Sequence, residues 1–309
     1  MVDMLLLHHC NLNMNVRAPG ISVWRGVVEV VLEALYANRP KFIQLPCPEA
    51  VYLGLRRWWF VKEQYDNAMY RSFCRKLASS VADILRMEDV SSVKLVGLGL
   101  SPSCAYRETQ SDGSWGGKPR DVDFSKNVKT GMGVWSEELV KALEAFHSSY
   151  YDLPPPLIYP GKRGEHTSLY PKTLEQAFAE TAAELGLNPS TIDLKKYSFL
   201  KAVDEDLRSG RNIVAPLEMA YEESGELNRF IEEGYGLVLI PEFRTANEST
   251  EFYLDVMATQ VENQARAGQT VAAVHPHGEK TRSYSRFVQL LIDRKAIPIE
   301  FTSKPRTSE

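Results

Sequence analysis

The sequence has no hydrophobic run long enough to span a membrane and no strong excess of charge of either sign. Its apolar start, residues 4–10, is too short for the core of a secretory signal peptide and has no basic residues before it. The 36 Lys and Arg side chains nearly balance the 40 Asp and Glu side chains, whereas non-specific nucleic-acid binding favours a strongly basic domain. We therefore predict a cytoplasmic protein with neither a membrane nor a nucleic acid as partner. The oligomeric state is left open.

Cysteine is scarce as well, and its four positions, Cys10, Cys47, Cys74 and Cys104, all lie in the first third of the chain. Without an export signal these thiols are expected to stay reduced, which favours metal binding or chemistry over disulfides. Cys74 lies beside the apolar stripe of a predicted helix, so we expect it to be a buried packing thiol.

A chain of 309 residues is long for one core, so two domains are expected, at residues 1–162 and 163–309. Strand-like runs alternate with helical periodicity, which predicts an α/β fold: each domain a mostly parallel sheet with covering helices, in Rossmann-like layers. The predicted strands are 4–10, 41–45, a run beginning at 93, and 154–159, then 212–215, 237–240, 270–274 and 297–301. The predicted helices are 23–37, 66–87 and 136–147, capped by Ser22, Asp66 and Ser136, then 171–185, 222–233, 248–267 and 281–294.

The stretch from residue 93 to residue 104 combines an apolar strand with the loop Ser-Pro-Ser-Cys. Gly97 has no side chain, so the backbone can approach another group closely there. Pro102 stiffens the loop. Cys104 is thereby placed at the carboxyl end of a strand, which is where open α/β sheets usually bind their ligands.

Three predicted strands end in a cysteine, at Cys10, Cys47 and Cys104. Cys47 lies in Pro-Cys-Pro-Glu, residues 46–49, which we predict to be a loop because proline cannot donate to a strand ladder. The carboxyl ends of parallel strands share one edge, so the thiols can converge. Three thiolates make a poor closed zinc site but suit a 4Fe–4S cluster with one iron left open. Three unrelated buried cysteines are the alternative.

Four short motifs carry a family resemblance over about residues 4–160: His-Cys-Asn-Leu-Asn at 9–13, Gln-Leu-Pro-Cys-Pro-Glu at 44–49, Lys-Glu-Gln-Tyr-Asp at 62–66 and Ser-Pro-Ser-Cys at 101–104. Together they resemble the thiouracil desulfurase (TudS-type) family and its uncharacterised TudS-related putative desulfidase relatives. The resemblance implies that Cys10, Cys47 and Cys104 bind a 4Fe–4S cluster whose remaining iron accepts the sulfur of a thiolated substrate.

The same resemblance implies catalytic roles for Glu49 and Ser101. The chemistry is consistent, since water must lose a proton or the leaving sulfur must gain one. The alternative for Glu49 is a carboxylate in the first turn of a helix, and for Ser101 a hydroxyl that only stabilises the turn. This chain departs from the family at Leu100 and Ala105, where the family usually has glycine.

The sequence thus predicts a 4Fe–4S-dependent desulfurase, or desulfidase, that removes sulfur as hydrogen sulfide from a small thiolated compound, thiouracil-like or a thioamide. Water replaces sulfur, with no net redox change. One alternative is a 4Fe–4S hydro-lyase that uses the open iron on a hydroxylated substrate. Another is a non-catalytic iron–sulfur sensor.

The second half of the chain contains no cysteine and no phosphate-binding glycine signature. Its predicted strands end in polar clusters that contain Glu218, Glu242, His275 and His277. These side chains are either a substrate or metal site or simply helix caps. The polar segment 107–132 in the first half is long enough to be a lid or binding loop.

Overall fold

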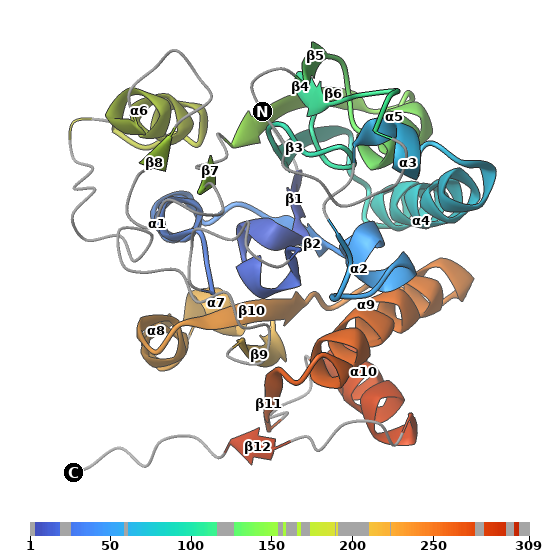
Figure 1. Ribbon diagram of the computed structural model, residues 1–309. Helices are drawn as coiled ribbons and strands as arrows, with labels where there is room; N and C mark the ends of the chain where they lie inside the picture. Colours follow the sequence, from blue (N-terminus) through green and yellow to red (C-terminus); the bar gives the residue numbers. More distant parts are fainter. Residues whose placement is uncertain are drawn as a thin grey trace.

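The computed structural model describes residues 4–18, 26–58, 61–115, 127–153, 157–158, 166–167, 174–188, 190, 210–222, 224–275, 281–294 and 300–302. Within these residues the chain forms two parallel four-stranded sheets with helices packed on them (Figure 1). The predicted α/β fold with parallel sheets is confirmed. None of the described helices is both long enough and apolar enough to cross a membrane.

The first sheet contains β1 (Met4–His8), β2 (Phe42–Leu45), β3 (Ser92–Leu98) and β6 (His147–Leu153), in the order β2-β1-β3-β6. All neighbouring strands are parallel. Every residue of β1 and β2 is buried, as expected for short apolar strands covered on both faces. Because β1 leads to β2 on one side while β3 lies on its other side, the chain reverses direction across the sheet beside β1. Such a reversal is where doubly wound sheets bind ligands.

The second sheet contains β9 (Arg211–Pro216), β10 (Tyr235–Ile240), β11 (Thr270–Val274) and β12 (Glu300–Thr302), in the order β10-β9-β11-β12. Its strands are also parallel. In both sheets the first strand in the chain lies second and the next strand lies at the edge. The two halves of the protein therefore repeat one topology.

Helices and short strands complete the fold. The helices are α1 (Glu29–Asn38), α2 (Pro48–Tyr52), α3 (Lys62–Tyr65), α4 (Ala68–Met87), α5 (Val134–Ala142), α6 (Leu174–Glu184), α7 (Met219–Glu222), α8 (Ser224–Glu232), α9 (Glu248–Arg266) and α10 (Arg282–Asp293), with 3-10 turns η1 (His9–Asn11) and η2 (Met14–Val16). Two antiparallel pairs lie outside the main sheets: β4 (Glu108–Gln110) with β5 (Val128–Thr130), and β7 (Leu157–Ile158) with β8 (His166–Thr167).

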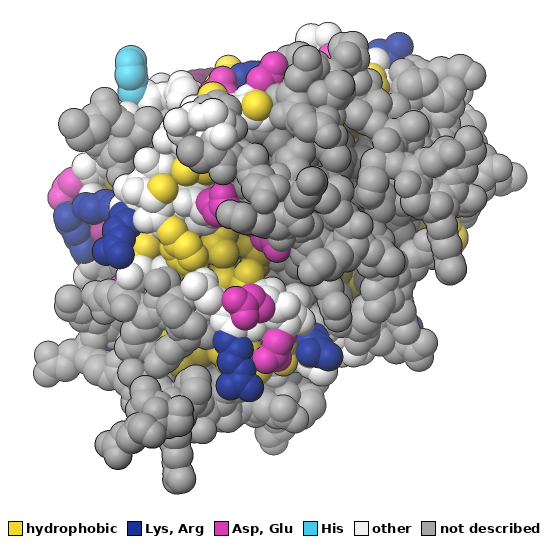
Figure 2. All heavy atoms as spheres, turned by 90° about the vertical axis from the view of Figure 1, so that its left-hand side faces the viewer, with side chains coloured by type: hydrophobic (Ala, Val, Ile, Leu, Met, Phe, Trp, Pro, Cys, Tyr) yellow, Lys and Arg dark blue, Asp and Glu magenta, His cyan; other side chains and the backbone are white. Residues whose placement is uncertain are grey.

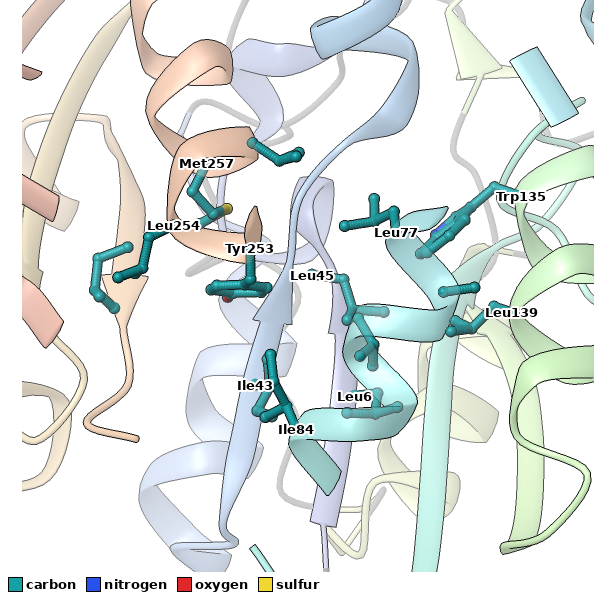
Figure 3. Close-up of a cluster of buried hydrophobic side chains, with 14 of the residues drawn as sticks. Leu6, Ile43, Leu45, Leu77, Ile84, Trp135, Leu139, Tyr253, Leu254 and Met257 are labelled. Carbon is teal, nitrogen blue, oxygen red and sulfur yellow. The ribbon is translucent and has the colours of Figure 1, made fainter. Parts of the chain in front are cut away.

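The two halves share their hydrophobic core. Tyr253 and Met257 of α9 belong to the same cluster of buried side chains as Leu77 of α4 (Figure 3). The buried Gln44 side chain of β2 also bridges to β10, donating to the carbonyl of Leu237 at 2.9 Å and accepting from the Leu239 N–H at 2.8 Å. A domain boundary at 162/163 falls in residues 159–165, outside the described residues, and stays a prediction.

Several predicted element ends need correction. The helix predicted to begin at residue 23 begins at Glu29, and Gly26 before it has φ 79°, a left-handed conformation that ends regular helix. The predicted cap Ser22 lies outside the described residues. Asn67, and not the predicted Asp66, caps α4. Its side-chain oxygen accepts a hydrogen bond from the Tyr70 N–H.

Two further corrections concern the end of the first sheet. α5 begins after Gly133, so Ser136 lies inside the helix and does not cap it. The edge strand is β6, whose seven residues were predicted to be the helix end and the connection after it. Of the residues predicted to form this edge, 157–158 pair instead with β8, and 154–156 and 159 lie outside the described residues.

A small cavity opens on the face where α1 and α6 lie, and Figure 2 shows hydrophobic side chains gathered at the centre of that face. The cavity has a volume of about 110 Å³ and is lined by Leu5, Val31, Leu35, Lys94 and Leu185, among others. Leu5 and Lys94 lie in the first halves of β1 and β3. This cavity is therefore at the opposite end of the strands from the cysteines.

Candidate active site

Three buried thiols lie at the carboxyl ends of three neighbouring strands. Cys10 lies in η1 directly after β1, Cys47 precedes α2 after β2, and Cys104 follows β3. The exposed fraction of each residue is below 9%. All four cysteines of the chain are free thiols. The strand order β2-β1-β3 puts these three strand ends next to one another at one edge of the sheet.

The ionisation of each thiol is coupled to that of the others. Burial raises the pKa of Cys10 to about 12 and that of Cys47 to about 11, and it raises the pKa of Cys104 well above its ordinary value. A negative charge on Cys47 raises the pKa values of Cys10 and Cys104 further. A negative charge on Cys10 also raises the pKa of Cys104. The thiols are therefore neutral in the metal-free protein, and a metal must displace their protons to bind.

The three thiols are the kind of donor that iron–sulfur clusters take. Among the described residues, no three His, Cys, Asp or Glu side chains are grouped closely enough to hold one metal ion. A 4Fe–4S cluster takes one thiolate on each iron, so its ligands surround the cluster and do not meet at a point. Three thiols without a fourth would leave one iron without a protein thiolate. Cys74 is fully buried in the apolar cluster beneath α4, which confirms it as a packing thiol.

Two glycines allow the loop that carries Cys104 to pack tightly. A Cβ atom on Gly97 would lie 2.4 Å from the carbonyl oxygen of Cys104, and one on Gly133 would lie 2.3 Å from the carbonyl carbon of Ser103. Leu100 has φ 61°, in the left-handed region that glycine adopts freely and that costs other residues roughly 1–2 kcal/mol. The backbone thus keeps a glycine-like shape at the position where the resembled family usually has glycine.

Gly133→Ala is expected to lower the free energy of unfolding by about 1–3 kcal/mol, because the new methyl group meets backbone atoms that cannot rotate away. Gly113→Ala is the matched control, since a Cβ atom there meets nothing within 4 Å. Chemical denaturation of both variants measures the difference. Equal stability of the two variants would contradict the tight packing of this loop.

The Ser101 hydroxyl stabilises the same loop. Its Oγ accepts the N–H of Ser103 at 3.3 Å and the N–H of Cys104 at 3.0 Å. The turn-stabilising alternative for Ser101 is therefore present in the structure. Its catalytic role stays a prediction, and because Oγ accepts both bonds, the hydroxyl hydrogen is left as a donor.

Glu49 lies in the first turn of α2. The prediction that residues 46–49 are all loop is wrong for Pro48 and Glu49, because Pro48 occupies the first position of the helix. Proline is favoured there, since the first helical N–H has no partner within the helix and the ring presets the helical φ. Cys47 precedes it as the N-cap. The thiol and the carboxylate are consequently held on one short rigid segment.

One oxygen of the Glu49 carboxylate is held and the other is available. Oε2 accepts one hydrogen bond from Nε of Arg57 and one from the hydroxyl of Tyr65, both at 2.9 Å. Arg57 is fixed in turn, since Nη1 donates to the carbonyl of Gly54 and Nη2 to that of Val16. Oε1 accepts no hydrogen bond from any residue that the structure describes, and the side chain is 12% exposed. A group that exchanges protons with a substrate or water needs such an available oxygen.

Helix α9, from the second half of the chain, supports the segment that carries Cys47 and Glu49 (Figure 1). The side-chain oxygen of Gln260 accepts a hydrogen bond from the Cys47 N–H at 2.6 Å. The side-chain nitrogen of Gln260 lies 2.7 Å from Nε2 of His9. Burial lowers the pKa of His9 to about 3, so this imidazole is neutral and accepts from the amide. Three residues further along α9, Asn263 donates to the carbonyl of Ala50 at 2.9 Å.

Gln260→Leu is expected to lower the free energy of unfolding by about 1–3 kcal/mol, because it leaves the buried Cys47 N–H and His9 ring without partners. Gln289→Leu, on the exposed face of α10, is the matched control because its side chain bonds only to Asp293. Thermal and denaturant unfolding compare the two. A Gln260→Leu variant as stable as the control would contradict the supporting role of α9.

No motif in the sequence marks Arg57, Gln260 or Arg17 as residues of the site. Tyr65 had a signal, since it belongs to the Lys-Glu-Gln-Tyr-Asp motif at 62–66. Its contact with Glu49 gives that motif a structural reason.

The structure decides between the two alternatives at one polar strand end of the second half, that of Glu242. Glu242 accepts the N–H of Ser283 at 2.9 Å and Nε of Arg282 at 3.1 Å, so it caps α10, as one of the two alternatives expected. His277 lies outside the described residues. The predicted lid, 107–132, contains the hairpin of β4 and β5, and its residues 116–126 also lie outside the described residues.

Comparison with known proteins gives one partial similarity. No protein-family model and no solved structure matches the chain. It is 35% identical over 98 residues to the uncharacterized protein MJ0003 of Methanocaldococcus jannaschii, an alignment that spans 32% of this chain and 63% of that protein. This similarity establishes a relative for part of the chain and names no family for it.

Proposed function

We propose that this protein removes sulfur, as hydrogen sulfide, from a small thiolated compound, with a 4Fe–4S cluster held by Cys10, Cys47 and Cys104. In the overall reaction a thiocarbonyl and water become a carbonyl and hydrogen sulfide, and no electrons are transferred. The observation that carries the proposal is the meeting of three mutually coupled buried thiols with one partly available carboxylate, Glu49. The motif resemblance supports the same reaction.

A bound cluster with an open iron would supply a soft Lewis acid, matched to the sulfur of a thiocarbonyl. The side chains of the protein must supply and accept the protons of the reaction. Replacing sulfur by water requires that water lose protons and that the leaving sulfur gain them. Glu49 can take up and return a proton at Oε1, while Arg57 and Tyr65 hold Oε2 and fix the orientation of the carboxylate. Ser101 can donate its hydroxyl hydrogen to the substrate.

The available carboxylate favours an enzyme over a sensor, because a sensor has no need of a proton-exchanging group beside its ligands. Free thiols at all four cysteines suit a reducing compartment such as the cytoplasm. The substrate is expected to be a small molecule.

The test is an assay of sulfide release. The full chain would be reconstituted anaerobically with iron and sulfide and given 2-thiouracil or thioacetamide, and sulfide and the oxygen-containing product would be measured together. Equal amounts of both, without an added electron donor, are expected. Release that requires a reductant, or a reconstituted chain that instead dehydrates hydroxylated compounds, would overturn the proposed reaction.

A further inference from the structure

Arg17 is a positively charged side chain at the candidate active site, and it has no ion-pair partner among the residues that the structure describes. It follows η2, and its guanidinium makes no hydrogen bond or ion pair with any residue that the structure describes. Its Nη1 atom is buried and unpartnered. The residue as a whole is half-buried, but a charged nitrogen that is buried without a partner is costly, so the position of this group requires an explanation.

The second guanidinium at the site has a protein partner at each of its three nitrogens. Arg57 uses Nε, Nη1 and Nη2 for Glu49, Gly54 and Val16. Glu49 pairs with Arg57 at 2.9 Å and forms no ion pair with Arg17, although its charge also acts on Arg17. The carbonyl that Arg57 binds belongs to Val16, the residue before Arg17, so the two arginines lie along the same short stretch of backbone.

The charge of Arg17 acts on the site residues. It interacts electrostatically with the thiols of Cys10 and Cys104 and with the carboxylate of Glu49, and it is opposed by Arg57. Burial lowers the pKa of Arg17, while the Glu49 carboxylate, and the thiols when they are ionised, act in the opposite direction. An arginine nevertheless stays protonated in proteins. Arg17 therefore brings a fixed positive charge with unused donors to the place where the substrate would bind.

We propose that Arg17 binds an anionic oxygen of the substrate, and that the preferred substrates are thiolated compounds that carry a carboxylate. The guanidinium is planar and its parallel N–H groups match the two oxygens of a carboxylate. Binding would give Nη1 the partner that the protein does not provide and would orient the sulfur relative to the thiols. The expectation that the substrate carries sulfur rests on the proposed function. The expectation that it carries an anionic group rests on Arg17 alone.

The experiment has one arm that needs no cluster. Binding of uracil and of uracil-6-carboxylate, sulfur-free analogues, would be measured by calorimetry on the metal-free full chain and on its Arg17→Gln and Arg17→Lys variants. The carboxylate is expected to bind about 10- to 100-fold more tightly than uracil, as a charge-assisted hydrogen bond predicts. Arg17→Gln removes the preference and Arg17→Lys restores part of it. Arg229→Gln, an exposed arginine paired with Glu233, leaves the preference unchanged.

The second arm uses the reconstituted chain with 2-thiouracil and 2-thiouracil-6-carboxylate, and it also measures iron content. Arg17→Gln is expected to raise KM for the carboxylate by about 10- to 100-fold while KM for 2-thiouracil and the iron content stay the same. Equal effects on both compounds, no effect on either, or loss of iron in Arg17→Gln would overturn the proposal. Carboxylate binding that depends on Arg17 in a chain that releases no sulfide would uphold the anion site and reject the proposed function.

Discussion

Replacing Cys10, Cys47 or Cys104 by serine is expected to reduce the iron content of the anaerobically reconstituted protein from about four atoms per chain to none. Serine has nearly the same shape, but its hydroxyl is a harder ligand that does not ionise under these conditions, and such clusters are held by thiolates. Because each of the three thiols is buried at a strand end, no other cysteine can replace the missing one. Iron and acid-labile sulfide analysis, with the absorption spectrum, measures the result.

Cys74→Ala is the control for these variants. Cys74 lies in the apolar cluster beneath α4, so its replacement should reduce stability slightly and leave the cluster intact. The circular dichroism of all four variants would show that they fold. If Cys74→Ala alone lost the iron, or if any of the three serine variants kept all of it, the assignment of ligands would be wrong.

Glu49→Gln is expected to keep the cluster and to lower kcat by about 10²–10⁴, the usual contribution of one general acid–base group. Glutamine has the shape of glutamate and can still accept hydrogen bonds from Arg57 and Tyr65, but it cannot exchange a proton at the available oxygen. The buried Arg57 loses a charged partner, so the free energy of unfolding falls as well. Kinetics must therefore be measured at a temperature where unfolding is absent.

Two further variants separate chemistry from packing. Tyr65→Phe removes one hydrogen bond to Oε2 and leaves the carboxylate in place, so a smaller loss, about 10-fold, is expected. Glu63→Gln changes an exposed carboxylate that only binds the loop at residues 111–112 and should not change kcat. A Glu49→Gln enzyme within a factor of two of the parent would assign Glu49 to the first turn of α2 and to nothing more.

The shared core changes how the second half of the chain can be studied. Tyr253 and Met257 of α9 belong to the buried cluster that includes residues of β2. Gln260 of α9 accepts a hydrogen bond from the Cys47 N–H. An isolated first half would lose these partners and expose the apolar face of its sheet. Single substitutions in the full chain, such as Gln260→Leu, therefore test the role of residues 163–309 more cleanly than truncation.

The sequence by itself determined the features that depend on local chemistry. Apolar β-branched runs bounded by Gly and Pro placed seven of the eight sheet strands close to where they lie, and three of these runs end in Cys10, Cys47 and Cys104. A parallel arrangement followed from the alternation of strands and helices, and it brings those three strand ends to one edge. The predictions that failed were the position of the edge strand, β6, and several helix ends. Pro48 at the start of α2 is an example, because proline can both end a strand and begin a helix.

Only the tertiary structure decided which side chains join the thiols. Arg57 lies beyond the end of α2, the helix that carries Glu49, and Gln260 lies 213 positions from Cys47. Because each contact joins two different segments, no helical or strand periodicity in the sequence records it. The unpartnered guanidinium of Arg17 also becomes visible only when its neighbours are known. A local pattern records what one segment needs for itself, whereas a site at the junction of two sheets is made by segments that meet only after the chain has folded.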